Sequence, residues 1–192
     1  MIQNWRRVSD EDFWFYARSF HAAAKKLAGM LEGSSGPFSQ FEVCPVVFMY
    51  RKAVEMKLKA IVLGAGGNFL ATKADPISVS KSISLSWLAQ FLCQIVTVLK
   101  WEASLKCEGV ENLADFKAII EDVNSVDPGP HSFRYPGEAQ FSIREFAAKM
   151  DALLELLDST ADALAATWDM QVDGVALDAG PDDGSDFGPT IQ

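Results

Sequence analysis

The stretch Tyr50–Ala60, YRKAVEMKLKA, mixes charged and apolar residues more densely than the sequence around it. Placed on a helix at 100° per residue, Arg51, Glu55 and Lys59 stack on one side, one turn apart. Apolar residues cover most of the remaining circumference, as expected of a helix that packs against several neighbours. The stretch therefore predicts a central helix that carries a single charged row.

This charged row has two interpretations. Glu55 can pair with Arg51 and with Lys59 at i,i+4 spacing, and each such pair stabilises an exposed helix by only about 0.2–0.5 kcal/mol. In the first interpretation the row is a solvated, ion-paired helix face. In the second it lines a groove between helices, where the cations face a phosphate-bearing ligand and Glu55 holds them in place. Lys57 lies on the apolar side, which predicts either a snorkelling side chain or an acidic partner from another helix or chain.

Further helices are predicted on both sides of this stretch. Ser9 followed by Asp12 is typical of a helix start, and apolar residues then recur at intervals of three and four up to Glu32. The central helix is expected to begin near Pro45, since proline suits a first helical turn. It is expected to end at Leu63, because the glycines of GAGGN follow.

The sequence of the second half of the chain predicts three more helices. The uncharged segment Ile83–Leu105 is expected to form one helix, and another is expected to start after Asn112 and to end before Pro128. Ser142 with Glu145 forms a capping box for the last and longest helix. In these last two helices apolar residues at helical spacing are expected to be buried: Leu113, Phe116, Ile120, Val123, Ile143, Phe146, Met150, Leu153, Leu157, Leu164 and Trp168.

These segments predict an all-α fold, a single-domain bundle of about five helices over residues 1–170, with no strand pattern. Residues 171–192 are predicted to form a disordered acidic C-terminal tail, since Val172–Gln192 contains five Asp and no Lys or Arg.

Composition narrows the classes of partner. The net charge is -9, and without Val172–Gln192 the chain has 17 basic and 21 acidic residues, which gives no strong electrostatic case for duplex nucleic acid. Three cysteines without a short C-x-x-C spacing favour reduced thiols and a cytoplasmic location. The N-terminus has no signal-peptide pattern. The uncharged run Ser82–Leu99 is about long enough to span a bilayer, but its Ser, Gln and Thr residues favour a buried or dimer-facing helix over a membrane span.

No complete catalytic constellation is visible in the sequence. The chain has two histidines, and His21 lies beside the apolar stripe of the first helix, where a packed, hydrogen-bonded role is expected. His131 lies beside Arg134 in a Pro-rich loop, a better place for chemistry because loops often carry it. Two histidines and scattered cysteines do not predict a metal site, and no other cofactor is indicated.

Two segments together resemble the HEPN-like helical domains. YRKAVEMKLKAIVLG is similar to the family's helix in which an aromatic-Arg pair precedes a Glu and then a Leu-Lys pair. DPGPHSFRYP resembles a loop with Asp-Pro and Phe-Arg-Tyr-Pro in a bacterial branch of the family. The residues that carry the match are Tyr50, Arg51, Glu55, Lys59, Asp127, Ser132, Phe133, Arg134, Tyr135 and Pro136.

The resemblance implies an all-α, usually dimeric domain of bacterial toxin–antitoxin and phage-defence systems, where many relatives bind nucleotides or cleave RNA. Ribonucleases of this family carry an Arg with a His four to six residues beyond it. None of the arginines here has a His at that spacing, and Lys52 stands where relatives often have a His. Metal-free RNA cleavage, in which His acts as acid or base on the 2′-hydroxyl, therefore lacks its usual residue.

Three functional hypotheses follow. The first is a non-catalytic binding or regulatory module, homodimeric through its helices, with a nucleotide, RNA or partner protein as its ligand. The second is a divergent metal-independent ribonuclease or nucleotidyl-transfer-related enzyme, and the third a purely structural helical interaction protein. The first hypothesis assigns ligand binding to Arg51, Glu55, Lys59, Arg134 and Tyr135, and the second assigns catalysis to His131 and Arg134, with Arg51.

Overall fold

The structure is a computed structural model that describes residues 9–32, 40–69, 76–100, 106–107, 109–126 and 142–178. Within these ranges it contains helices and no strand, apart from an isolated bridge between Cys107 and Val110. The all-α fold predicted from the sequence is therefore confirmed. The helices are α1 (Asp10–Glu32), α2 (Gln40–Phe69), α3 (Pro76–Lys81), α4 (Leu85–Val98), α5 (Leu113–Val126) and α6 (Ile143–Asp178).

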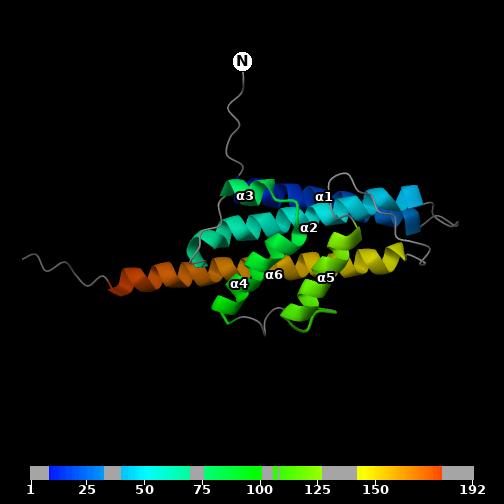
Figure 1. Cartoon of the computed structure of the whole chain (residues 1–192). Coiled ribbons are helices and arrows are strands. Elements are labelled where there is room, and N and C mark those ends of the chain that lie inside the picture. The colour runs from blue at the N-terminus through cyan, green and yellow to red at the C-terminus, as the bar shows by residue number, and fades with distance from the viewer. Residues whose placement is uncertain are drawn as a thin grey trace, which may run out of the picture.

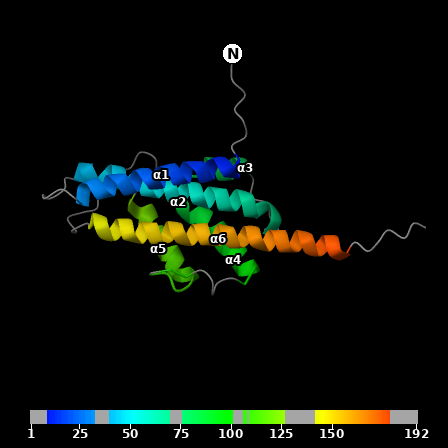
Figure 2. The ribbon, with the colours of Figure 1, turned by 180° about the vertical axis from the view of Figure 1, so that it is seen from behind.

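Helix α2 is the central element of the bundle. In two opposite views it lies between α1 and α6, and the three long helices run side by side (Figures 1 and 2). Helices α4 and α5 cross this layer on one face, and α2 packs against α1, α3, α4 and α6. The prediction that Tyr50–Ala60 forms a helix with several neighbours is thus confirmed.

The apolar core lies where α2 meets α4 and α6. Burying a Leu or Ile side chain stabilises a fold by roughly 1.5–3 kcal/mol, so these contacts provide most of the force that holds the layers together. The fully buried residues of this core include Val46, Val54 and Leu58 of α2, Leu85, Leu88, Leu92 and Ile95 of α4, and Met150, Leu153, Leu154 and Leu157 of α6.

Three of the predicted helix starts carry the expected caps. Ser9 and Asp12 form a reciprocal box, in which the Asp12 amide donates to Ser9 Oγ at 3.2 Å and the Ser9 amide donates to Asp12 Oδ2 at 2.9 Å. Asn112 Oδ1 accepts from the amides two and three residues further on. The amide of Glu145 donates to Ser142 Oγ at 3.3 Å. Each cap satisfies amides that the first helical turn leaves without an intrahelical acceptor.

The predicted bounds of the central helix are wrong at both ends. Helix α2 begins at Gln40 rather than near Pro45, and it continues through GAGGN to Phe69. A glycine costs a helix only about 1 kcal/mol, which tertiary packing can offset. Gly64 also permits a close approach of α1, because a Cβ atom added there would lie 3.2 Å from Asp10 Oδ2.

The single helix predicted over Ile83–Leu105 is also wrong. Helix α4 starts only at Leu85, where Ser84 Oγ accepts the amide of Trp87 at 3.2 Å as an N-cap. The helix ends at Val98, and Lys100 has a φ of 57°, a left-handed conformation typical of residues just past a helix end. Among the residues that the structure describes, no helix combines the length and apolar character needed to cross a membrane.

Helix α6 begins where the capping box predicts but runs further than expected. It ends at Asp178, so residues 171–178 are helical and do not belong to a disordered tail. Residues 179–192 of the predicted tail lie outside the described part of the chain. The predicted buried residues of α5 and α6 are buried, except that Leu113 and Phe146 are half-buried and Trp168 is not among the described side chains.

Candidate functional site

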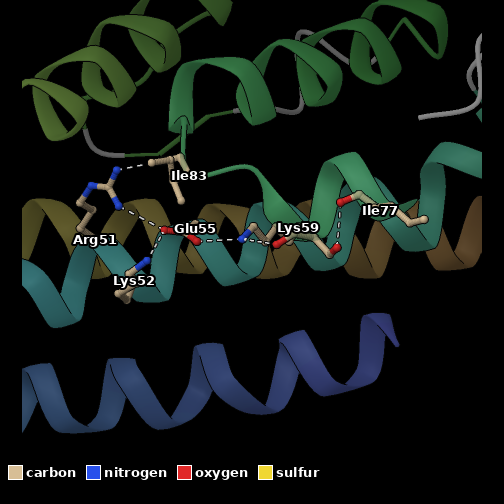
Figure 3. Close-up of polar contacts among 7 residues, drawn as sticks. Arg51, Lys52, Glu55, Lys59, Ile77 and Ile83 are labelled. Atoms are coloured by element: carbon tan, nitrogen blue, oxygen red, sulfur yellow. Dashed lines mark hydrogen bonds and ion pairs between the residues drawn. The ribbon is translucent and has the colours of Figure 1, made fainter. Parts of the chain in front are cut away.

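The charged row of α2 is assembled around one carboxylate. Glu55 Oε2 accepts from Arg51 Nη1 at 3.1 Å and from Lys52 Nζ at 2.8 Å, and Glu55 Oε1 accepts from Lys59 Nζ at 2.8 Å. All four residues lie on α2, so the helix itself sets their spacing (Figure 3). The i,i+4 pairs predicted from the sequence are therefore confirmed.

The two cations at the ends of the row also bind backbone carbonyls outside α2. Arg51 Nη2 donates to the carbonyl oxygen of Ile83 at 2.9 Å, and Lys59 Nζ donates to that of Ser80 at 3.0 Å. Both carbonyls belong to the chain between the last turn of α3 and the start of α4 (Figure 3). Because a cation stabilises carbonyls at a helix C-terminus, Lys59 fixes the end of α3 while Arg51 fixes the entry to α4.

The interpretation of this row as a solvated helix face is wrong. Arg51, Glu55 and Lys59 are 2%, 1% and 3% exposed. Transfer of charges out of water costs several kcal/mol per ion and is tolerated only where close partners and hydrogen bonds compensate. The carboxylate with three cations around it, together with the two carbonyls, supplies that compensation. The helical periodicity was correct, but α3 and the start of α4 cover the polar side.

Lys57 lies outside the row and is held by α6. Its Nζ forms an ion pair with Asp158 and donates to the carbonyl oxygen of Leu154 at 2.8 Å. The ring of Trp14 on α1 lies 5.9 Å from the same nitrogen. Burial lowers the pKa of Lys57, while the hydrogen bond and charge of Asp158 oppose that change. The predicted acidic partner from another helix is therefore confirmed.

A second polar cluster joins α1, α2 and α6 around Asp151. Its Oδ1 lies 2.6 Å from His21 Nε2 and accepts from the Tyr50 hydroxyl at 3.1 Å, while Lys25 Nζ lies 3.2 Å from Oδ2. Burial raises the pKa of Tyr50, and the charge of Asp151 raises it further. The prediction of a packed, hydrogen-bonded role for His21 is confirmed.

The remaining predicted site residues lie outside the described part of the chain. These are His131, Arg134 and Tyr135, with the rest of the Phe-Arg-Tyr-Pro loop. Their position relative to Arg51 and Lys59 stays a prediction. Within the described ranges, no three His, Cys, Asp or Glu side chains gather as a metal-binding group.

Sequence reasoning missed the two acids of α6. Asp151 and Asp158 stand at the two ends of a run that contains four buried leucines, and each meets a polar residue that interrupts the apolar side of α1 or α2. A search for acids spaced two turns apart on α6 would have found both, since they stand seven positions apart on one helix.

Comparisons with known proteins add no relative. No family model, no curated protein and no solved structure matches this chain. The likeness to HEPN-like domains therefore rests on the two sequence segments described above.

Proposed function

We propose that this chain is a non-catalytic helical binding and regulatory module that acts as a homodimer through its helices. The observation that carries the proposal is the closure of the charged row of α2 within the fold. Arg51 and Lys59 are buried, bind Glu55, and bind the carbonyls of Ile83 and Ser80. These bonds join α2 to the α3–α4 connection, and this structural role is enough to explain the charged row without a ligand.

A phosphate-binding role for the same row would be costly. A nucleotide would need guanidinium and ammonium groups that can turn towards its phosphates. Here it would have to displace two backbone carbonyls and compete with Glu55 at a site that is almost fully buried. This favours a module that works by contact between surfaces over one that holds a nucleotide at Arg51 and Lys59.

Large apolar side chains on the surface support the association part of the proposal, since exposed apolar area is often an interaction site. Phe15 and Met30 are each 73% exposed, and Tyr16 is 53% exposed. In the toxin–antitoxin or phage-defence setting that the HEPN-like resemblance implies, such a module would act by holding a partner protein or RNA, without cleaving it.

The test combines an activity assay with a mass measurement. Labelled RNA and labelled nucleotides are incubated with the wild type and with His131→Ala, and the mass in solution is measured by sedimentation equilibrium. We expect no cleavage by either protein and a dimer mass for both. Binding of RNA without cleavage would identify a ligand and support the proposal. Cleavage by the wild type that is lost in His131→Ala would replace it with the ribonuclease hypothesis.

A further inference from the structure

The outer face of α1 carries a seam of the kind that pairs two helices. Asp12, Phe15, Ser19, Ala22 and Lys26 follow one another at intervals of three and four residues, the spacing of a heptad seam. All five are exposed. The buried residues of α1 lie on the opposite side of the helix, and α1 forms an edge of the bundle in both ribbon views (Figures 1 and 2).

This seam contains both a knob and a hole. Ser19, Ala22, Ala23 and Lys26 stand at i, i+3, i+4 and i+7, the four positions that surround a hole in knobs-into-holes packing. Three of the four are small, so the hole can accept a large ring. Phe15, one turn before the hole and 73% exposed, supplies one. The Ser19 hydroxyl already donates to the carbonyl of Phe15 at 3.0 Å, so covering it would leave no unpaired donor.

Phe15 of one copy fits the hole of another copy when the two α1 helices run antiparallel, with a two-fold axis at Ser19. Phe15 then lies over Ala22 and Ala23 of the second copy, and the reverse contact forms at the same time, as two-fold symmetry requires. In this register Asp12 faces Lys26 of the second copy, so two ion pairs flank the crossing. The antiparallel helix dipoles also attract each other.

We propose that α1 is the surface through which two copies of this chain associate, antiparallel about Ser19, with Phe15 of each copy in the small-residue hole of the other. The inference rests on the homodimer of the proposed function and specifies its surface. Arg18 lies about a quarter turn from the centre of the seam, at the flanking g position next to the two-fold axis. Its long side chain must turn towards solvent to keep the two like charges apart.

Two glutamate variants test the surface, one inside and one outside the seam contact. Phe15 and Met30 are equally exposed, at 73%, on the same helix. In the proposed register Met30 lies one turn beyond Lys26, outside the seam that runs from Asp12 to Lys26. Phe15→Glu is expected to raise the dimer dissociation constant by about tenfold or more, as loss of an aromatic anchor does. Met30→Glu is expected to leave it unchanged, measured by sedimentation equilibrium, with circular dichroism showing that both variants fold.

Charge reversal tests the register. Asp12→Lys or Lys26→Asp alone is expected to weaken the dimer by about fivefold, since each replaces two attractive pairs by two repulsive ones. The double reversal is expected to restore wild-type association. Asp12→Lys also removes the hydrogen bond from the Ser9 amide to Asp12. The double variant lacks this bond too. If association is nevertheless restored, the ion pair between the two copies is the cause.

The outcomes separate this inference from the proposed function. A wild type that is monomeric at ~100 µM, where a dimer of ordinary affinity would be populated, overturns the homodimer itself. A dimer that is unaffected by Phe15→Glu overturns α1 as its surface and leaves the homodimer standing. Equal weakening by Phe15→Glu and Met30→Glu, or a double reversal that fails to restore the dimer, overturns the antiparallel register about Ser19.

Discussion

Helices α1 and α2 reverse the usual distribution of polar and apolar side chains. The central helix α2 holds Arg51, Glu55, Lys57 and Lys59 at 3% exposure or less, whereas α1 leaves Phe15 73% exposed. Each buried cation of α2 binds a carboxylate and a backbone carbonyl of this chain, and the buried Glu55 accepts from Arg51 and Lys59. The difference shows that a polar side chain can be buried when its hydrogen bonds and ion pairs are complete, and that an apolar one can stay exposed.

The comparison assigns different roles to the two helices. The charges of α2 are compensated inside one chain, so their removal should affect folding before anything else. The outer face of α1 offers apolar area and small residues to water, so changes there should affect association and leave the fold intact. The variants below test this division.

The largest effect is expected at the carboxylate of α2. Glu55→Gln removes the negative charge that Arg51, Lys52 and Lys59 share, leaving buried cations without compensation. We expect the free energy of unfolding to fall by about 3–5 kcal/mol, measured by urea denaturation with circular dichroism. The matched control is Glu121→Gln on the exposed side of α5, which should stay within about 0.5 kcal/mol. A loss at Glu55 as small as that of the control would contradict a structural role.

Lys57 and Asp158 allow a finer test of buried charge. Asp158→Ala leaves the buried ammonium group without its acid and should cost about 1–3 kcal/mol. Lys57→Met removes the buried charge and keeps similar side-chain volume, so it should stay within about 1 kcal/mol of the wild type. Thermal or urea unfolding of both variants checks the order. A greater loss for Lys57→Met than for Asp158→Ala would show that the ammonium group itself holds α2 to α6.

The Asp151 cluster should give a pH signature. Because the pKa of Tyr50 is raised from its ordinary value of 10.0, the unfolded chain loses the phenolic proton before the folded chain does. The free energy of unfolding should therefore fall as the pH rises above about 10, by at most ~1.4 kcal/mol per pH unit from this group. Urea denaturation between pH 8 and pH 11 (approximately the range around the ordinary Tyr value) checks the slope, and Tyr50→Phe should reduce it. An identical slope in that variant would assign the fall to other groups.

The smallest effect on folding is expected on the outer face of α1. Phe15→Glu and Met30→Glu should change the free energy of unfolding by no more than about 0.5 kcal/mol, because both side chains are exposed within one chain. The measurement is urea denaturation at a protein concentration low enough for the wild type to be monomeric. A loss comparable to that of Glu55→Gln would erase the distinction between the two helices.

Local signals predicted the parts of the fold that local chemistry decides. The caps at Ser9, Asn112 and Ser142 marked three helix starts because a side chain there binds amides of its own first turn. The glycines after Leu63 misled for the opposite reason. The cost of each glycine to a helix is small, and the close approach of α1 to α2 at Gly64 brings in Asp10, a sequence-distant residue.

The sequence predicted the ion pairs of the candidate site but not their burial beneath the α3–α4 connection. The i,i+4 spacing of Arg51, Glu55 and Lys59 indicated their bonds, because one helix fixes them. Their burial depends on carbonyls of Ser80 and Ile83, which no side-chain pattern identifies. Lys57 was the exception, since a lysine on an apolar side already predicted either a snorkelling side chain or an acidic partner from another helix or chain, and the second holds.

The most direct test of the central claim is the midpoint of thermal unfolding as a function of protein concentration, for the wild type, Glu55→Gln and Phe15→Glu. Association stabilises the folded state by mass action, so a dimer's midpoint rises with concentration. The account predicts a rising midpoint for the wild type, a lower but still rising one for Glu55→Gln, and for Phe15→Glu a rise that begins only at about tenfold higher protein concentration or above. A wild-type midpoint that does not depend on concentration, or a Phe15→Glu midpoint that rises as the wild type's does, would contradict it.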